Sequence, residues 1–143
     1  MARFLGVDYG GKRIGLAIGD DGLRIASPLG TIAAGGEIED VAAVLRWAEE
    51  QDADALVVGV PLNMDDTVGP QAELTRRFVA ALRSKGGLPV HEQDERLSSF
   101  AADEALAAGG LSRRGRNSRR DKLAAQVILQ AFLDRCGGVG HSE

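Results

Sequence analysis

The stretch from residue 4 to residue 20 constrains the fold more than any other part of this 143-residue chain. Two runs rich in Val, Ile and Leu flank a turn that contains Gly10, Gly11 and Lys12, and this pattern predicts a β-hairpin. Asp8 ends the first run, so we expect its carboxylate at the carboxyl end of a strand that is buried on both faces. An acid in this place either caps the turn or binds a cation, and the hairpin alone leaves both alternatives open.

Composition limits the class of protein before any other motif is considered. With 143 residues, of which 44% are hydrophobic, the chain is predicted to form one domain over residues 1–136, followed by a disordered tail over residues 137–143. No apolar run is long enough for a membrane span, and the N-terminus lacks the order of segments found in a signal peptide. The single Cys136 cannot form an internal disulfide, so we expect a reduced, cytoplasmic setting.

Positive charge is concentrated in one short segment, although the formal net charge of the chain is -4. Six basic side chains lie there against one acid: Arg113, Arg114, Arg116, Arg119, Arg120 and Lys122. Such a segment would neutralise the phosphates of a nucleic acid, which gives salt-dependent affinity. For each arginine taken singly, a solvated basic loop is an equally good interpretation. Lys12 and Arg13 at the hairpin tip have the same two interpretations.

The rest of the chain alternates predicted strands and helices. Residues 24–32 are predicted as an edge strand because Pro28 lacks an amide donor, and residues 55–60 and 88–91 are predicted as two further strands. Helices are predicted over residues 37–51, 70–85, about 98–110, and 121–135. The predicted fold class is therefore α/β: a five-stranded mixed sheet, with three antiparallel strands followed by two parallel strands and helices on both faces.

Helical spacing predicts which side of three helices is buried. The predicted positions are Ile38, Val41, Ala42, Leu45 and Ala48 in the first helix, Ala72, Leu74, Phe78, Val79 and Leu82 in the second, and Ala124, Ala125, Ile128, Leu129, Ala131 and Phe132 in the last. Asp121 projects near the middle of the last arc. A carboxylate on a buried face is costly unless it is paired or binds a metal, so Asp121 is expected to point inward at the sheet edge. Its alternative role is an N-terminal cap.

Acidic residues also follow the ends of the predicted parallel strands. Asp8, the turn at residues 61–63, and the pair Asp94 and Glu95 should meet at the carboxyl rim of the sheet. Together with Asp121 they are oxygen ligands of the kind that Mg²⁺ or Mn²⁺ prefers. Two such ions roughly 3.5–4 Å apart would activate a water and stabilise the leaving oxygen of a phosphodiester. Because alternate strand residues face opposite ways, only one of Asp94 and Glu95 is expected to serve, and both stay open.

Four blocks of the sequence resemble the signature of a known family. They are Val7-Asp8-Tyr9-Gly10 with Lys12-Arg13-Ile14-Gly15, Gly59-Val60-Pro61-Leu62-Asn63-Met64-Asp65 with Thr67 and Gly69, Asp94-Glu95-Arg96-Leu97-Ser98-Ser99, and Asp121 with Ala124-Ala125 and Ile128-Leu129-Gln130. In this order they resemble the YqgF/RuvX family. Its members are bacterial RNase H-like proteins, regarded as relatives of Holliday-junction resolvases and as nucleases that trim the 5′ end of the 16S ribosomal RNA precursor.

The resemblance implies an RNase H-like fold and hydrolysis of phosphodiesters that depends on Mg²⁺ or Mn²⁺. It implies that Asp8, Glu95 and Asp121 form the catalytic and metal-binding triad, and that Asn63 lines the site. The residues expected to contact substrate besides Asn63 are Lys12, Arg13, Arg96, Arg113, Arg114, Arg116, Arg119 and Arg120. Precursor rRNA is the expected substrate, with branched DNA as the alternative. Because one core uses the predicted apolar faces, we expect a monomer or a weak homodimer.

Two positions depart from the pattern of this family. Asp66 stands where the family usually has Gly and adds negative charge near a phosphate site, and Arg120 occupies a position that is more often aliphatic. Other classes of protein also stay open. The hairpin resembles the phosphate-binding opening of actin-type and sugar-kinase-type ATPases, although the chain has no room for their second lobe. A nucleic-acid-binding ribosome-assembly factor without catalytic activity would keep the same fold, and the sequence does not choose between endonuclease and exonuclease.

Overall fold

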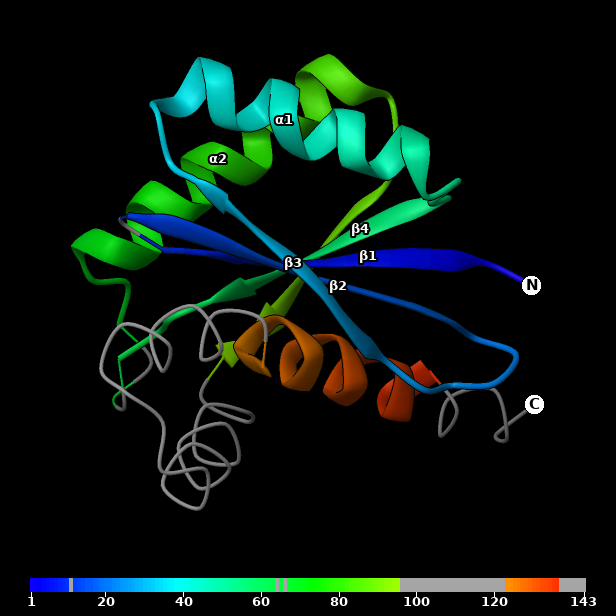
Figure 1. The fold of residues 1–143 in the computed structure, drawn as a ribbon. Coiled ribbons are helices and arrows are strands. Elements are labelled where there is room, and N and C mark those ends of the chain that lie inside the picture. Colours follow the sequence, from blue (N-terminus) through cyan, green and yellow to red (C-terminus); the bar gives the residue numbers. More distant parts are fainter. Residues whose placement is uncertain (11, 64, 66, 96–122, 137–143) are drawn as a thin grey trace, which may run out of the picture.

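The computed structural model describes residues 1–10, 12–63, 65, 67–95 and 123–136. In this part of the chain five strands form one sheet in the order β3-β2-β1-β4-β5 (Figure 1). The strands are β1 (Arg3–Tyr9), β2 (Arg13–Asp20), β3 (Ser27–Ala33), β4 (Ala55–Val60) and β5 (Val90–Asp94). β2 pairs antiparallel with both β1 and β3, whereas β4 pairs parallel with both β1 and β5. The predicted mixed sheet, with three antiparallel and two parallel strands, is confirmed.

The first two strands form the predicted hairpin. Asp8 pairs with Gly15, and Tyr9 pairs with Ile14. The amide of Gly10 donates a hydrogen bond to the carbonyl of Arg13 at 3.1 Å, which closes the tip.

The third strand is shorter than the sequence predicts. It begins at Ser27 and not at residue 24, because the chain turns before it. The Oδ1 atom of Asp20 accepts hydrogen bonds from the amides two and three residues later, at 3.0 and 2.7 Å, and Arg24 has a φ of 56°. Pro28 lies in this strand at the edge of the sheet, as predicted.

Helix α1 (Glu37–Glu50) has the predicted bounds to within one residue but a different buried side. Its buried residues are Asp40, Val41, Val44 and Ala48. Ile38 is 77% exposed and Ala42 is exposed, so the prediction that both are buried was wrong. The carboxylate of Asp40 accepts a hydrogen bond from the amide of Gly35 at 2.9 Å. This contact turns Asp40 inward and the apolar side chain of Ile38 outward.

Helix α2 (Pro70–Gly86) begins at the predicted proline and ends before Gly87, which has a φ of 70°. Its buried residues are Ala72, Thr75, Phe78, Val79 and Leu82. Leu74, which was predicted to be buried, is 47% exposed. Thr75 is buried in its place, because its hydroxyl donates to the carbonyl of Gln71 at 2.9 Å and so has a partner within the helix.

The two parallel strands were predicted with unequal success. β4 has the predicted bounds, and its six residues are all buried. β5 runs two to three residues later than the predicted 88–91, because its pairing with β4 begins at Val90 opposite Leu56 and continues to Asp94 opposite Val60. The partner strand sets these limits, and the polar sequence of β5 itself does not reveal them.

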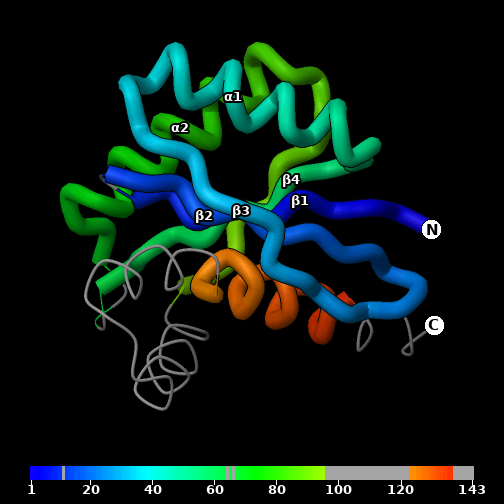
Figure 2. The backbone as a smooth tube through the Cα atoms, viewed as in Figure 1, coloured from blue at the N-terminus to red at the C-terminus, as the bar shows by residue number. Residues whose placement is uncertain are grey.

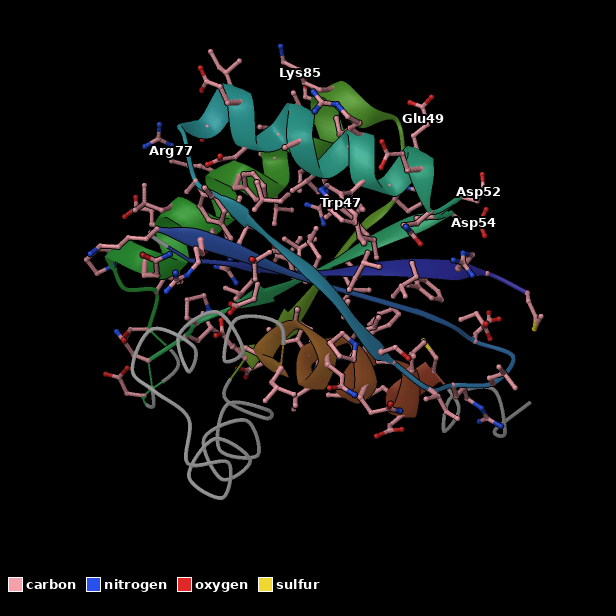
Figure 3. All side chains as sticks on the ribbon, viewed as in Figure 1. Trp47, Glu49, Asp52, Asp54, Arg77 and Lys85 are labelled. Carbon is pink, nitrogen blue, oxygen red and sulfur yellow. The ribbon has the colours of Figure 1, made fainter. Side chains whose placement is uncertain are left out.

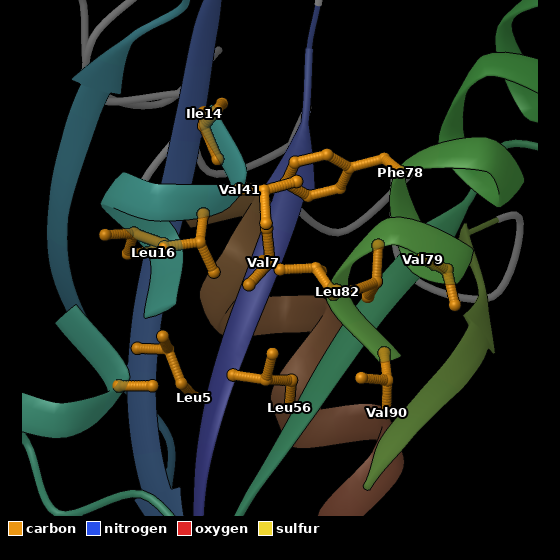
Figure 4. Packing of buried hydrophobic residues seen from close by; sticks show 13 residues of the cluster. Leu5, Val7, Ile14, Leu16, Val41, Leu56, Phe78, Val79, Leu82 and Val90 are labelled. Carbon is orange, nitrogen blue, oxygen red and sulfur yellow. The ribbon is translucent and has the colours of Figure 1, made fainter. Parts of the chain in front are cut away.

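The sheet separates two layers of helices, so the core has two parts (Figures 1 and 2). Between the sheet and the layer of α1 and α2 lies one cluster of buried side chains, shown in Figure 4. It contains Leu5, Val7, Ile14, Leu16, Val41, Val44, Ala48, Leu56, Val58, Phe78, Val79, Leu82 and Val90. On the other face a C-terminal helix, residues 123–136, packs against Phe4, Ala17 and Val57. Helices therefore cover both faces, as predicted.

The buried side of the C-terminal helix largely follows the prediction. Its buried residues are Ala125, Ile128, Leu129, Phe132 and Leu133. Ala124 and Ala131 are half-buried, and Leu133 was not predicted. The predicted helix at 98–110 and the predicted disordered tail lie outside the described residues. Among the helices that the structure describes, none is long and apolar enough to cross a membrane.

Candidate active site at the carboxyl end of the parallel strands

The C-terminal helix approaches the sheet closely at two glycines. A Cβ atom on Gly6 would lie 2.8 Å from Cβ of Leu129, and a Cβ atom on Gly59 would lie 2.5 Å from Cδ1 of Ile128. A β-carbon at these distances would force Leu129 and Ile128 to shift, so glycine at both positions allows the helix to pack closely on β1 and β4. The contacts fix the helix over the part of the sheet that carries Asp8.

This helix runs in the direction opposite to β1 (Figure 1). The carbonyl of Ala125 lies over Gly6, whereas Leu133 lies over Gly19, which pairs with Phe4 near the start of β1. Later residues of the helix therefore lie nearer to the amino end of β1. The beginning of the described helix faces the carboxyl end of β1, where Asp8 is.

Asp8 lies on the sheet face that carries the C-terminal helix. In β1, Phe4 packs with that helix, whereas Leu5 and Val7 pack in the cluster under α1 and α2. Strand side chains alternate between faces, so half-buried Asp8 belongs with the helix. Tyr9 has the opposite orientation, with its ring stacked on a ring of α2 at a centroid distance of 4.0 Å.

The same alternation shows which face of the sheet Asp94 occupies. Glu92 faces α2, where its carboxylate lies 3.6 Å from the guanidinium of Arg76. Gln93 faces the C-terminal helix, to which it is hydrogen-bonded. Asp94 therefore falls on the face of α2. Glu95 directly follows the last residue of β5 and has 3₁₀ conformation, so the alternation ends at Asp94.

The register of the strands brings Asp8 and Glu95 to one rim. Val7 pairs with Val58, and Gly59 pairs with Gln93, so Asp8, Gly59 and Gln93 form one row across three strands. Neighbouring strands lie about 4.8 Å apart, so the row is about 10 Å wide. Glu95 lies beyond this row, directly after the end of β5. Asp121, the third predicted member, lies outside the described residues.

The loop after β4 is built from its own hydrogen bonds. The Nδ2 atom of Asn63 donates to the hydroxyl of Thr67 at 2.8 Å, and that hydroxyl donates to Oδ1 of Asp65 at 2.6 Å. The backbone amide of Asn63 also donates to the Thr67 carbonyl, at 3.0 Å. Both nitrogens of Asn63, Nδ2 and the backbone amide, therefore donate hydrogen bonds within the loop. The exposed side chain lies at the carboxyl end of β4. Asp66 lies outside the described residues.

Two of the predicted basic contacts are described. Lys12 is exposed and Arg13 is half-buried, and both lie at the hairpin tip, on the rim that carries Asp8. The amide of Ala34 donates to the carbonyl of Lys12 at 2.9 Å, which ties the tip to the end of β3. The remaining predicted contacts lie outside the described residues: Arg96, Arg113, Arg114, Arg116, Arg119 and Arg120.

The donor set at this rim suits a hard divalent cation. Asp8 and Glu95 offer carboxylate oxygens, which are the ligands that Mg²⁺ and Mn²⁺ take. Within the described ranges no group of three or more His, Cys, Asp or Glu side chains is arranged to hold a metal ion. The predicted set needs Asp121, so the described residues supply two of its three members.

A cavity of about 580 Å³ lies far from this rim, where α1 ends and β4 begins. Its lining combines apolar Leu45, Ala48, Ala53, Gly86 and Leu88 with charged Glu49, Asp52, Asp54 and Lys85. Figure 3 shows Glu49, Asp52 and Asp54 together at the start of β4, at the right of the view. Three carboxylates against one ammonium group would repel a phosphate, so this cavity does not suit a nucleic acid.

One residue near the site was not predicted from the sequence. Gln93 is fully buried, and its Oε1 accepts a hydrogen bond from Nη1 of Arg135 at 3.0 Å. It lies within the polar run of residues 91–95. Such a run predicts exposure throughout, and the alternation of the strand becomes visible only when both faces of the sheet are covered.

Comparison with known proteins gives close relatives over the whole described fold. The family model of RuvX, described as Holliday junction resolvase, matches residues 2–135. A protein of Anaeromyxobacter dehalogenans (strain 2CP-C) named "Putative pre-16S rRNA nuclease" is 49% identical over 133 residues, which cover 93% of this chain and 97% of the relative. A protein of the same name from Moorella thermoacetica is 43% identical over 138 residues, which cover 96% of this chain and 99% of the relative.

Solved structures share the fold at low sequence identity. RuvC of T. thermophilus in complex with Holliday junction substrate superposes with a TM-score of 0.61 at 18% identity, over 96% of this chain and 97% of that one. The Holliday junction resolvase of fowlpox virus gives a TM-score of 0.56 at 12% identity, over 93% and 99%. These likenesses confirm the predicted RNase H-like fold. With a matching family model and relatives that are matched over nearly their full length, the chain belongs to the RuvX family.

Proposed function

We propose that this chain is a nuclease that hydrolyses phosphodiester bonds with the help of Mg²⁺ or Mn²⁺, and that it processes the 5′ end of the 16S rRNA precursor. The observation that supports the proposal is that Asp8, near the carboxyl end of β1, and Glu95, directly after the carboxyl end of β5, lie at one rim of the sheet. The substrate is supported by the relatives, which are named for pre-16S rRNA.

Asp8, Glu95 and Asp121 are the proposed ligands. Asp121 precedes Ala125 by four residues and Ile128 by seven, which is the spacing of one stripe on a helix. Ala125 and Ile128 contact the sheet at the two glycines beside Asp8. A pair of bound ions would supply an activated water and stabilise the leaving oxygen.

The basic residues have a separate proposed role. Lys12 and Arg13 stand on the rim of the candidate site, where cationic side chains would hold the phosphates on either side of the cut. Arg96 and the arginines of residues 113–120 would extend this contact. In the absence of cations the site carboxylates would repel the same phosphates, so the basic residues and the ions act on substrate together.

A second candidate function is cleavage of branched DNA. It is favoured by the description of the family as Holliday junction resolvase. Paired cuts on a junction would require two copies of the chain. A binding factor without nuclease activity is a third candidate, and the same assay distinguishes all three.

The test uses a 5′-labelled 16S rRNA precursor fragment and a four-way DNA junction, each incubated with Mg²⁺ or Mn²⁺. We expect cleavage of the RNA, and a loss of about 100-fold or more in Asp8→Asn, Glu95→Gln and Asp121→Asn. Asp94→Asn is the matched control, because its side chain falls on the opposite face, and its rate should stay within about twofold.

Three results would contradict the proposal. Cleavage that survives both Asp8→Asn and Asp121→Asn would come from another nuclease. Cleavage of the junction alone would favour the DNA function. Binding of the RNA without cleavage by the unaltered chain would favour the non-catalytic factor.

A further inference from the structure

Gln93 is a buried polar residue that the proposed chemistry leaves unused. Its side chain is fully buried in β5 and faces the C-terminal helix. The Oε1 atom has a partner, since Arg135 donates to it at 3.0 Å. The Nε2 atom of the same amide is buried and has no hydrogen-bond partner among the residues that the structure describes.

Arg135 determines which end of the Gln93 amide lacks a hydrogen-bond partner among the described residues. A guanidinium only donates hydrogen bonds, so it selects the oxygen of the Gln93 amide. Exchange of the amide oxygen and nitrogen would set two donors against each other. The unpaired group is therefore an NH₂ donor that faces away from Arg135. Leaving such a donor unpaired costs about 1–3 kcal/mol, and most buried donors find an acceptor.

The geometry around Gln93 limits what this acceptor can be. Complete burial excludes the phosphate of a polymeric substrate, so the acceptor belongs to the protein. Glu95 follows two residues later, directly after the end of β5, and two residues of chain span at most about 7 Å between the two Cα atoms. Asp8 lies about 10 Å away across two strands, and Ile128 fills the space over Gly59 between them. Glu95 is the better placed of the two carboxylates.

We propose that Gln93 is a positioning residue for the metal site, whose Nε2 donates a hydrogen bond to the Glu95 carboxylate when the site binds its cation. The proposal rests on the proposed function, which makes Glu95 a ligand. A donor on one carboxylate oxygen fixes the rotamer of Glu95 and directs the other oxygen to the cation. Arg135 acts on Glu95 indirectly. It binds Oε1 of Gln93 and so orients the Gln93 amide with Nε2 toward Glu95. Partners of this kind alter metal affinity by about tenfold or more.

The first test is calorimetric titration of the full chain with Mn²⁺, together with urea unfolding of each variant without metal. Gln93→Met keeps the volume of the side chain and removes its polar atoms. We expect its free energy of unfolding to be unchanged or higher, because an unpaired buried donor is removed, while the Mn²⁺ dissociation constant rises about tenfold. Arg135→Met should weaken Mn²⁺ less and in the same direction. Glu92→Gln is the matched control, since this neighbour faces α2, and should leave Mn²⁺ affinity unchanged.

A double-variant cycle then tests the partner. If Gln93 acts through Glu95, adding Gln93→Met to Glu95→Gln should change the Mn²⁺ dissociation constant by less than about twofold. In RNA cleavage at saturating Mn²⁺, Gln93→Met should lower kcat and leave KM for RNA unchanged, because the residue does not reach the substrate.

The outcomes separate this inference from the proposed function. If Glu95→Gln weakens Mn²⁺ binding and Gln93→Met does not, the positioning role is refuted and the nuclease proposal stands. Additive losses in the double variant also refute the role. If the unaltered chain binds Mn²⁺ with the expected dependence on Gln93 but cleaves no nucleic acid, the nuclease proposal fails and the contact stands. If the unaltered chain does not bind Mn²⁺, both are refuted.

Discussion

Ile128 of the C-terminal helix lies directly against Gly59 of β4, so that a Cβ atom on Gly59 would come within 2.5 Å of its Cδ1 and 3.1 Å of its Cγ1. Gly59 stands in the row between Asp8 and Gln93. The helix is therefore held against the sheet at the level where the candidate site begins.

Gly59→Ala should destabilise the protein and impair cleavage, because the Ile128 side chain must leave its packed position, or the helix must shift, to admit a methyl group. We expect the free energy of unfolding to fall by about 1–3 kcal/mol, measured by urea denaturation. Gly30→Ala is the control, since its Cβ would lie 3.6 Å from the ring of Trp47, an ordinary contact, and should change stability by less than about 0.5 kcal/mol. Equal losses in the two variants would contradict the close approach at Gly59.

Tyr9 is the single tyrosine of the chain, so absorbance of tyrosinate reports its ionisation alone. Burial raises its pKa above the ordinary value of 10.0, the carboxylates of Asp40 and Glu37 raise it further, and Arg77 lowers it. We expect an alkaline titration with a midpoint above 10.0. Glu37→Gln should lower this midpoint and Arg77→Gln should raise it. A midpoint at or below that of free tyrosine would show that the ring is more solvated than the structure indicates.

The raised pKa of Tyr9 also predicts how stability depends on pH. The folded state holds the Tyr9 hydroxyl proton more tightly than the unfolded state does. The protonated hydroxyl therefore adds to the free energy of unfolding fully below the unfolded pKa of 10.0, and this contribution is lost as pH rises through the folded pKa. Urea denaturation across this range should show falling stability, and the fall should be smaller in Tyr9→Phe. An identical slope in both proteins would assign the effect to other groups.

Gln130 ties the C-terminal helix to the turn between β2 and β3. Its Oε1 accepts from the amide of Ala26 at 2.9 Å, and its Nε2 donates to the carbonyl of Arg24 at 2.8 Å. Gln130→Ala leaves these backbone groups without partners and should cost about 1–3 kcal/mol. Hydrogen exchange at the Ala26 amide should become faster. Asp134→Ala is the control, because that exposed carboxylate accepts a hydrogen bond from Nε2 of Gln130 and does not bond the backbone of Ala26, and it should leave exchange at Ala26 unchanged.

Asp40 fixes the start of α1. Asp40→Ala removes the acceptor for the Gly35 amide, and we expect a loss of about 1–2 kcal/mol in the free energy of unfolding. Ile38→Ala, at a side chain that is 77% exposed, should cost less than about 0.5 kcal/mol. If Ile38→Ala instead lowered the free energy of unfolding more than Asp40→Ala, the buried side of α1 predicted from the sequence would be correct.

Elements defined by local signals could be predicted from the sequence. The hairpin follows from two apolar runs around a glycine turn, and β4 follows from its continuous apolar run. The buried side of α1 could not be predicted, because it depends on the contact between Asp40 and Gly35. The bounds of β5 depend on its partner strand, which the polar residues 91–95 do not reveal.

The candidate site was predicted to a similar extent. Topology alone places Asp8 and Glu95 at one rim, because parallel strands end on the same side. The face that Asp94 occupies could not be predicted, since only the contacts of Glu92 and Gln93 show which face of β5 is which. Buried Gln93 was missed for the same reason.

The separation of the helices into two layers has a practical use. Trp47, the single tryptophan, lies in α1 and contacts the sheet at Gly30, on the side away from the C-terminal helix (Figure 3). Its fluorescence emission reports on the half of the protein that carries no proposed metal ligand. A variant that stops cutting RNA while this signal keeps its wavelength and intensity has a defect confined to the far side of the sheet.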